Sequence, residues 1–292
     1  MTARACFARL FVAGLALALF AAPGLTAMQG AQKTIFVTAL DDKGKPVTDM
    51  AAGDILVRED TVDRQVVSVK KTTTPAAVAI LVDTTTEAQS FVQDIRAGLK
   101  GFIEVMQKES PESEIALWEF GQASIQIKDF TTDHEALLKE AGRVYPKQRA
   151  ASVLLEALYD TTQALSRRKS PRRAIVSINV EPSTEVSSQQ PQRVLNSLIA
   201  SRSQVWAVSV HKGELKNPQR DVVLNRFVQV GGGRREIVFT DNAVEVLLRD
   251  YASSLANQYE VTYTRPSGKP QVVQVGTARP GVKLIAGLVP PQ

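Results

Sequence analysis

The apolar run AAVAILV, residues 76–82, constrains the fold of this chain more than any other segment. It shows no alternation between apolar and polar residues, so a strand formed by it must be covered on both faces. Such strands are typical of parallel sheets that carry helices on both sides. The run ends at Asp83, and Thr84, Thr85 and Thr86 follow directly. We therefore expect polar side chains at the end of a buried central strand.

Beyond this strand, expected strands and expected helices alternate along the chain. The helix expected over 87–109 carries apolar residues three and four positions apart, which is the spacing of one helical face. The alternation predicts right-handed crossovers and an α/β fold with a doubly wound, mostly parallel sheet. Further strands are expected at 115–120, 124–127, 174–178, 205–210 and 237–239, and further helices at 133–144, 152–168, 191–201, 222–230 and 241–257.

Strand patterns without helices flank this α/β region at both ends. Residues 34–72 contain three short strand patterns and the segment DDKGKP, in which Gly and Pro favour a turn. Residues 258–292 return to strand patterns. Neither segment is long enough to bury an apolar face alone. We expect the two to pack together as one small β domain, with the α/β domain, residues 76–257, inserted between them.

The first 27 residues have the features of a secretory signal peptide. Arg4 and Arg9 precede an apolar run at 10–22, and small residues lead to Ala27. The alternative is a transmembrane anchor, but a span needs about 20 apolar residues, and this run is shorter. No later segment is apolar enough to cross a membrane. We expect an exported protein, periplasmic or extracellular.

Composition excludes several classes of function. Without residues 1–27, 33 basic and 30 acidic residues remain, so the net charge is +3, which argues against nucleic-acid binding. Cys6 is the only cysteine and lies in the expected leader, so disulfides, thiol nucleophiles and thiolate metal sites are not expected. No hydroxyl nucleophile stands in a recognisable motif with a base. The sequence therefore predicts that the protein is not an enzyme.

Several segments, taken in order, resemble a known family. An apolar strand runs into Asp-x-Thr at residues 83–85, after the leader VTALDDKGKPVTDMAAGDILVRED. RRAIVSINVE and the C-terminal QYEVTYTRPSG and TARPGVKLIAG follow. These segments resemble the von Willebrand factor type A domain, and more closely the bacterial exported proteins described as VWFA-related. The resemblance covers residues from about 34 to the end.

The resemblance implies a metal-ion-dependent adhesion site, at which many type A domains bind Mg²⁺ through oxygen ligands. The family pattern is D-x-S-x-S after the first strand, a Thr from a later loop, and the Asp of T-D-G after a central strand. Asp83 and Thr85 match the first two positions, and Ser152 stands at the position of the later Thr. These three residues are the candidate metal ligands that the resemblance supplies.

Other positions of the pattern differ in kind. Glu87 stands where the second serine belongs, and Asn179 and Val180 stand where Thr and Asp belong. Glu181 is adjacent, but we expect its side chain to turn the other way, because successive strand residues face opposite sides. Either Glu87 rebuilds the site by supplying the charge lost at Val180, or the site is degenerate and Glu87 only opens a helix. We favour the degenerate site.

We therefore expect an exported, non-enzymatic protein-binding module that needs no metal or other cofactor and recognises an unidentified protein partner. One alternative is Mg²⁺-dependent adhesion through a rebuilt site at Asp83, Thr85 and Glu87. A second alternative is a part of, or an accessory to, an exported hydrolase. The expected surface is formed by the loops at the carboxyl ends of the strands, and its candidate binding residues are Asp83, Thr85, Glu87, Ser152, Asn179 and Glu181.

Three further features have simple explanations. His134 and His211 stand far from any metal-ligand cluster in the sequence, and we expect surface histidines. Trp206 lies in an expected strand and is expected in the core. The segment SRRKSPRR, 166–173, follows a helix and favours a solvated turn, because cations complement a helix C-terminus. Its alternative is a docking point for an acidic partner or a lipid surface.

Overall fold

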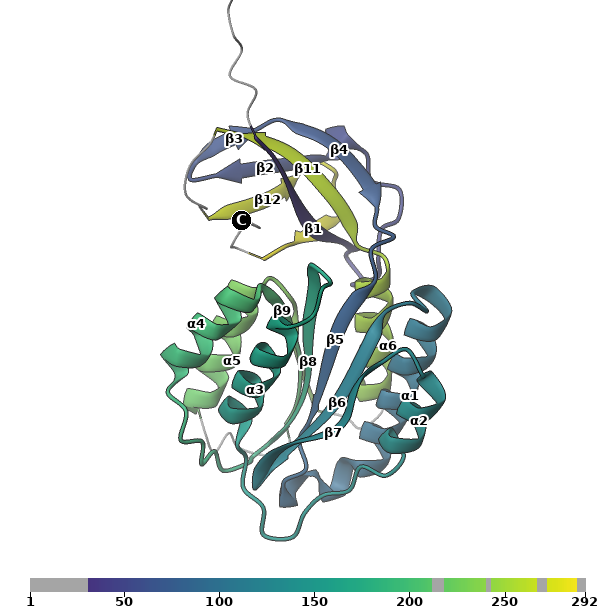
Figure 1. The fold of residues 1–292 in the computed structure, drawn as a ribbon, viewed down its shortest axis with the longest axis vertical. Helices are drawn as coiled ribbons and strands as arrows, with labels where there is room; N and C mark the ends of the chain where they lie inside the picture. The colour runs from purple at the N-terminus through teal and green to yellow at the C-terminus, as the bar shows by residue number, and fades with distance from the viewer. Residues whose placement is uncertain (1–30, 212–217, 240–242, 267–271, 288–292) are drawn as a thin grey trace, which may run out of the picture.

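The computed structural model describes residues 31–211, 218–239, 243–266 and 272–287 (Figure 1). The expected signal peptide, 1–27, lies outside these residues. The chain forms an α/β unit with helices on both sides of a sheet, and a β unit that packs at one end of that sheet (Figure 1).

The α/β unit is built on one six-stranded sheet with the order β10-β9-β8-β5-β6-β7. Four neighbouring pairs are parallel, and only β6 and β7 are antiparallel. The prediction of an α/β fold with a mostly parallel sheet is therefore confirmed. The strands are β5 (Ala76–Val82), β6 (Glu114–Gly121), β7 (Ala123–Thr131), β8 (Arg172–Glu181), β9 (Ser203–His211) and β10 (Arg235–Val238).

Two apolar clusters cover the two faces of this sheet. In β5 the residues Val78, Ile80 and Val82 belong to one cluster, and the intervening residues belong to the other, which explains the unbroken apolar run. Helices α1 (Val92–Glu109), α2 (His134–Ala141) and α6 (Ala243–Ala256) cover the first face, and α3 (Leu154–Ser166), α4 (Pro191–Ser201) and α5 (Pro218–Gly231) cover the second (Figure 1). Within the described ranges, none of these helices is long and apolar enough to cross a membrane.

The β unit combines strands from both ends of the chain. One sheet has the order β13-β1-β11-β4 and the other β12-β2-β3, with antiparallel neighbours throughout. Val37, Val261 and Tyr263 are in the apolar core of this unit. The strands are β1 (Ala31–Asp41), β2 (Ile55–Glu59), β3 (Val62–Arg64), β4 (Val66–Lys71), β11 (Tyr259–Arg265), β12 (Val273–Thr277) and β13 (Val282–Ile285), with a short helix η1 (Ala52–Asp54) before β2.

Because β5, β8 and β9 are parallel, their carboxyl ends meet at one edge of the sheet. The short helix η2 (Thr86–Phe91) follows β5 at this edge. The loop before α3 joins it, since the backbone N–H of Lys147 donates to the carbonyl of Thr84 at 2.8 Å. The loop after β8 joins it through Ser152, whose N–H donates to the carbonyl of Thr184 at 2.7 Å. This edge carries the candidate site, as expected for an open α/β sheet.

Candidate functional site

Asp83 is the centre of a buried polar network at the carboxyl end of β5, and it is only 1% exposed. Its Oδ1 accepts hydrogen bonds from the backbone N–H of Thr85 at 2.9 Å and from the Thr85 hydroxyl at 2.6 Å. Its Oδ2 accepts from the backbone N–H of Val180 at 3.0 Å and from Nη2 of Arg220 at 3.2 Å. These four donors match the roughly four lone-pair sites of a carboxylate. The protein therefore uses the hydrogen-bonding capacity of Asp83 internally.

Arg220 brings a positive charge into this network from the first turn of α5. Its side chain is 1% exposed, and Nη2 lies 3.2 Å from Oδ2 of Asp83. Nη1 lies 3.4 Å from Oε1 of Glu181, and Nε lies 3.7 Å from Oε2 of Glu185. The guanidinium carbon is also 5.9 Å from the centre of the Phe120 ring. One buried cation thus faces three carboxylates, which offsets part of the cost of burying each charge.

Glu181 joins the network. Its side chain turns the other way from that of Val180, as expected, but Asp83 faces the same side as Glu181, so the inference that this turn takes Glu181 out of the site was wrong. Val82 and Val180 both lie in the apolar cluster under α1 and α6, so Asp83 and Glu181, one residue further along each strand, face the opposite side. That side is the one covered by α5, which supplies Arg220. Burial raises the pKa of the Glu181 carboxyl above its ordinary value, while the charge of Arg220 acts in the lowering direction.

Hydroxyl groups complete the network. The Ser183 hydroxyl donates to the carbonyl of Val180 at 2.6 Å, and its oxygen lies 2.9 Å from that of Thr85. Ser152 is buried, and its hydroxyl donates to Oε2 of Glu185 at 2.7 Å. Ser152 therefore reaches Asp83 only through Glu185 and the guanidinium group. Its backbone also joins the loop after β8, because its carbonyl accepts from the N–H of Val186 at 2.8 Å.

Two other candidate residues stay outside the network. Glu87 is half-buried in η2, and its side chain forms no hydrogen bond or ion pair within the part of the chain that the structure describes. Asn179 is buried, but its amide donates to the carbonyl of Val208 at 3.1 Å and its Oδ1 accepts from Ser177, so it links β8 to β9. Val180 contributes only backbone groups, its N–H to Asp83 and its carbonyl to Ser183, because its side chain packs in the core. The structure brings together Asp83, Thr85, Ser152 and Glu181, and adds Ser183, Glu185 and Arg220.

The residues of this network do not fit a Mg²⁺ ion. Mg²⁺ requires near-octahedral oxygen coordination at about 2.0–2.1 Å. Here both oxygens of Asp83 already accept two hydrogen bonds each, and one of the donors is the Arg220 guanidinium. The guanidinium group would repel the ion. Two unit charges of the same sign about 4 Å apart repel each other by about 4 kcal/mol at an effective dielectric constant of 20, and Mg²⁺ carries two charges. Among the described residues, no group of three or more His, Cys, Asp and Glu side chains is arranged to hold a metal ion.

Sequence reasoning missed Arg220, although the fold offered a signal. We expected the helix to begin at Val222, but α5 begins at Pro218 and includes the arginine in its first turn. A helix that follows a parallel strand begins at the carboxyl edge of the sheet, so its first side chains can reach that edge. An arginine at this place in the sequence is therefore a candidate partner for a carboxylate such as Asp83.

The structure confirms some predictions about the burial of single side chains and contradicts others. The prediction that His134 and His211 lie at the surface was wrong, because both are buried. The ring of His211 packs at 5.9 Å from that of Phe239, and burial lowers its pKa. The prediction that Trp206 is a core residue is confirmed. Its ring packs at 5.2 Å from that of Tyr251.

Comparisons with known proteins bear on the fold. No family model matches this chain, and no curated protein matches it. A solved structure of a von Willebrand factor type A protein from Catenulispora acidiphila has a TM-score of 0.53 at 11% identity, covering 87% of this chain and 72% of that chain. Proximal thread matrix protein 1 of the mussel byssus has a TM-score of 0.53 at 10% identity, covering 68% of this chain and 50% of that chain.

At these identities the likeness shows the fold and no more. The matched part spans most of this chain, including the α/β unit with its six-stranded sheet. The α/β unit of this chain therefore has the fold of a von Willebrand factor type A domain.

Proposed function

We propose that this protein is an exported, non-enzymatic module that binds another protein without a metal ion. The observation that carries the proposal is the buried ion pairing of Arg220 with Asp83 and Glu181. In a metal-dependent adhesion site the cation links the domain to its partner. Here the cation is a covalent part of the chain and is almost completely buried. The network is then a structural support for the loops above it.

The loops at the carboxyl edge carry the surface that we propose for binding. Tyr145 lies in the loop before α3 and is 54% exposed, and Val186 lies in the loop after β8 and is 55% exposed. Phe239, just after β10, is also exposed. Exposed apolar and aromatic side chains of this kind are common at protein interfaces. The rigid network below holds two of these loops through Thr85, Ser152 and Ser183.

The same burial supports a non-enzymatic role. Asp83 and Glu181 are covered by the protein, and their oxygens are already occupied by internal donors. A catalytic carboxylate must reach the reacting group of a substrate, at about 2.6–3.2 Å or through one water molecule. Among the described residues of this edge, these carboxylates offer no such approach.

Capture of the partner tests the proposal. Immobilised protein would be exposed to an envelope or secreted fraction, once with Mg²⁺ and once with a chelator. We expect the same partner under both conditions and its loss with Val186→Asp. Val62→Asp is the matched control, because Val62 is 50% exposed on β3, in the other unit of the protein. Capture that requires Mg²⁺, or that survives Val186→Asp together with Tyr145→Asp, would contradict the proposal.

A further inference from the structure

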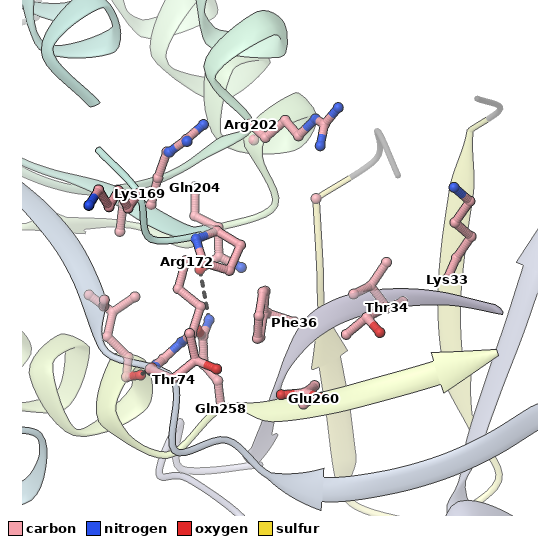
Figure 2. A pocket seen from close by; sticks show the side chains of 18 of the residues that line it. Lys33, Thr34, Phe36, Thr74, Lys169, Arg172, Arg202, Gln204, Gln258 and Glu260 are labelled. Atoms are coloured by element: carbon pink, nitrogen blue, oxygen red, sulfur yellow. Dashed lines mark hydrogen bonds between the residues drawn. The ribbon is translucent and has the colours of Figure 1, made fainter. Parts of the chain in front are cut away.

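A cavity of about 540 Å³ lies between the two units of the protein, at the end of the central sheet opposite Asp83. One wall is formed by β1 and β11 of the β unit, including Thr34, Phe36 and Glu260 (Figure 2). The other wall is formed by the amino ends of β8 and β9, including Arg172 and Gln204. Cavities of about 300–1,000 Å³ are typical of small-molecule sites.

The cavity has a strong excess of positive charge. Its only acidic lining residue among those described is Glu260, which pairs with Lys70 at 2.9 Å. By contrast, five basic residues line it, and none of them forms an ion pair with any residue that the structure describes. The five are Lys33, Lys169, Arg172, Arg173 and Arg202. Three of them come from the segment that we expected to be a solvated turn.

Arg172 is a buried cation that has no counter-charge among the residues the structure describes, so the solvated-turn prediction was wrong for this residue. It is 4% exposed. Its Nε donates to Oε1 of Gln258 at 3.2 Å, and its other nitrogens donate to the carbonyls of Thr74 and Leu255. All three acceptors are neutral. Desolvation lowers the pKa of Arg172 to about 10, in the absence of a described carboxylate that would oppose it.

Arg173 and Arg202 add to this excess. Nη1 and Nη2 of Arg173 donate to the carbonyls of Ser201 and Arg168 at 3.0 and 2.7 Å, but its buried Nε has no hydrogen-bond partner among the described residues. Burial lowers the pKa of Arg173, and the charge of Arg202 lowers it further. An anion between these groups would relieve their repulsion and give the buried guanidinium groups a counter-charge.

The placement of the cations indicates what kind of anion would fit. Lys33 belongs to the β unit, whereas Lys169 and Arg202 belong to the α/β unit, so positive groups stand on both walls (Figure 2). Neutral donors and acceptors come from Gln204 and Gln258, and Phe36 adds an apolar surface. We propose that this cavity binds a small organic molecule with two or more anionic groups, either carboxylates or phosphates. This site is independent of the protein-binding surface proposed above.

The bound anion would also join the two units. Gln258 already connects them, because its amide donates to Oε1 of Gln204 at 2.8 Å and to the hydroxyl of Thr38 at 3.0 Å. The indole N–H of Trp206 lies 3.4 Å from the same Oε1 of Gln204. Binding in the cavity should therefore change both the thermal stability of the protein and its tryptophan fluorescence.

The test titrates the purified protein with citrate, as the carboxylate probe, and with pyrophosphate, as the phosphate probe, against sodium chloride at equal ionic strength. We expect a saturable rise in Tm and a saturable change in fluorescence with at least one of the two, and neither with chloride. A response to citrate alone assigns carboxylate ligands, and a response to pyrophosphate alone assigns phosphate ligands. A response to both supports a site that accepts either kind of anionic group.

A pair of double variants makes the test specific. Lys169→Gln with Arg202→Gln should weaken the affinity for the responding anion at least tenfold. Lys108→Gln with Arg226→Gln removes the same charge from exposed positions on α1 and α5 and should leave the affinity unchanged. The proposal is wrong if neither anion gives a saturable response beyond that of chloride, or if the two double variants weaken it equally.

Discussion

The two ends of the central sheet both contain a buried arginine, but the surroundings of the two arginines differ in charge. At the carboxyl end, Arg220 faces the carboxylates of Asp83, Glu181 and Glu185. At the amino end, Arg172 faces two backbone carbonyls and an amide oxygen. The first end supplies its own counter-charge. The second end leaves positive charge without a described partner.

This comparison separates a structural polar cluster from a candidate ligand site. Burying a charge is unfavourable unless other groups compensate it, and a complete internal set of partners leaves little for a ligand to add. At the carboxyl end the compensation is internal, which is why we propose that binding there uses the loop surface and no metal ion. At the amino end the compensation is incomplete, and a cavity lies beside the uncompensated groups.

The largest expected effect is that of removing the cation at the carboxyl end. Arg220→Ala leaves three carboxylates close together, two of them almost fully buried, and removing one partner of a buried ion pair costs about 3–5 kcal/mol. We expect a loss of that size in the free energy of unfolding by urea. Arg226→Ala, at an exposed position of the same helix, should change it by less than about 0.5 kcal/mol.

The same variant also tests whether the carboxyl end can bind Mg²⁺. Arg220→Ala vacates space beside Asp83, Glu181 and Glu185, so millimolar Mg²⁺ should raise its Tm while leaving that of the unmodified protein unchanged. A ligand that binds only the native state stabilises it by about 2.7 kcal/mol at a hundredfold excess over Kd. If Mg²⁺ stabilises the unmodified protein, and Asp83→Ala abolishes that effect, the metal-free proposal fails.

A smaller effect is expected at the amino end. Arg172→Met removes a buried charge that has no described counter-charge, so part of the desolvation cost disappears together with the hydrogen bonds. The vacated acceptors on Thr74, Leu255 and Gln258 lie beside a cavity. We expect a loss of about 1–3 kcal/mol, the usual cost of leaving a buried acceptor unsatisfied. A loss as large as that of Arg220→Ala would remove the distinction between the two ends.

The sequence predicted the framework of the molecule more fully than its site. The run at 76–82 predicted a strand covered on both faces, because that environment allows no polar residue on either side. Polar side chains were predicted at the end of this strand because they follow it directly in the sequence, and the structure joins Asp83 and Thr85 there by two hydrogen bonds. Such local relations depend on a few adjacent residues and can be recognised without tertiary information.

The partners from distant parts of the chain were not predicted. Arg220 is 137 residues from Asp83, and only the tertiary arrangement, in which α5 packs against β9, brings the two together. The family pattern directed attention to Val180, whereas the carboxylate that reaches Arg220 belongs to Glu181, on the other face of the strand. Charge in a buried network is shared among segments, so matching single positions to a pattern does not locate it.

The smallest expected effect concerns the pH dependence of the carboxyl end. Burial raises the pKa of Glu181 above its ordinary value of 4.5, and the nearby charge of Asp83 acts in the same direction, while Arg220 opposes them. The folded state therefore holds a proton on Glu181 at pH values where the unfolded state has released it. It follows that this residue makes the protein less stable as the pH rises from about 4.5 through its folded-state pKa.

Replacing Glu181 by Gln isolates that contribution. Gln keeps a similar shape but does not ionise, so the stability of Glu181→Gln minus that of the unmodified protein should increase as the pH rises through this window and then become constant. Urea unfolding at closely spaced pH values measures the difference, in which the contributions of other titrating groups cancel. The matched control is Glu260→Gln, which replaces a half-buried carboxylate that is paired with Lys70 in the β unit. Its stability difference from the unmodified protein should not increase with pH. A difference that instead falls with pH would mean that the charge of Arg220 outweighs burial at Glu181, so that the folded state favours the ionised carboxylate.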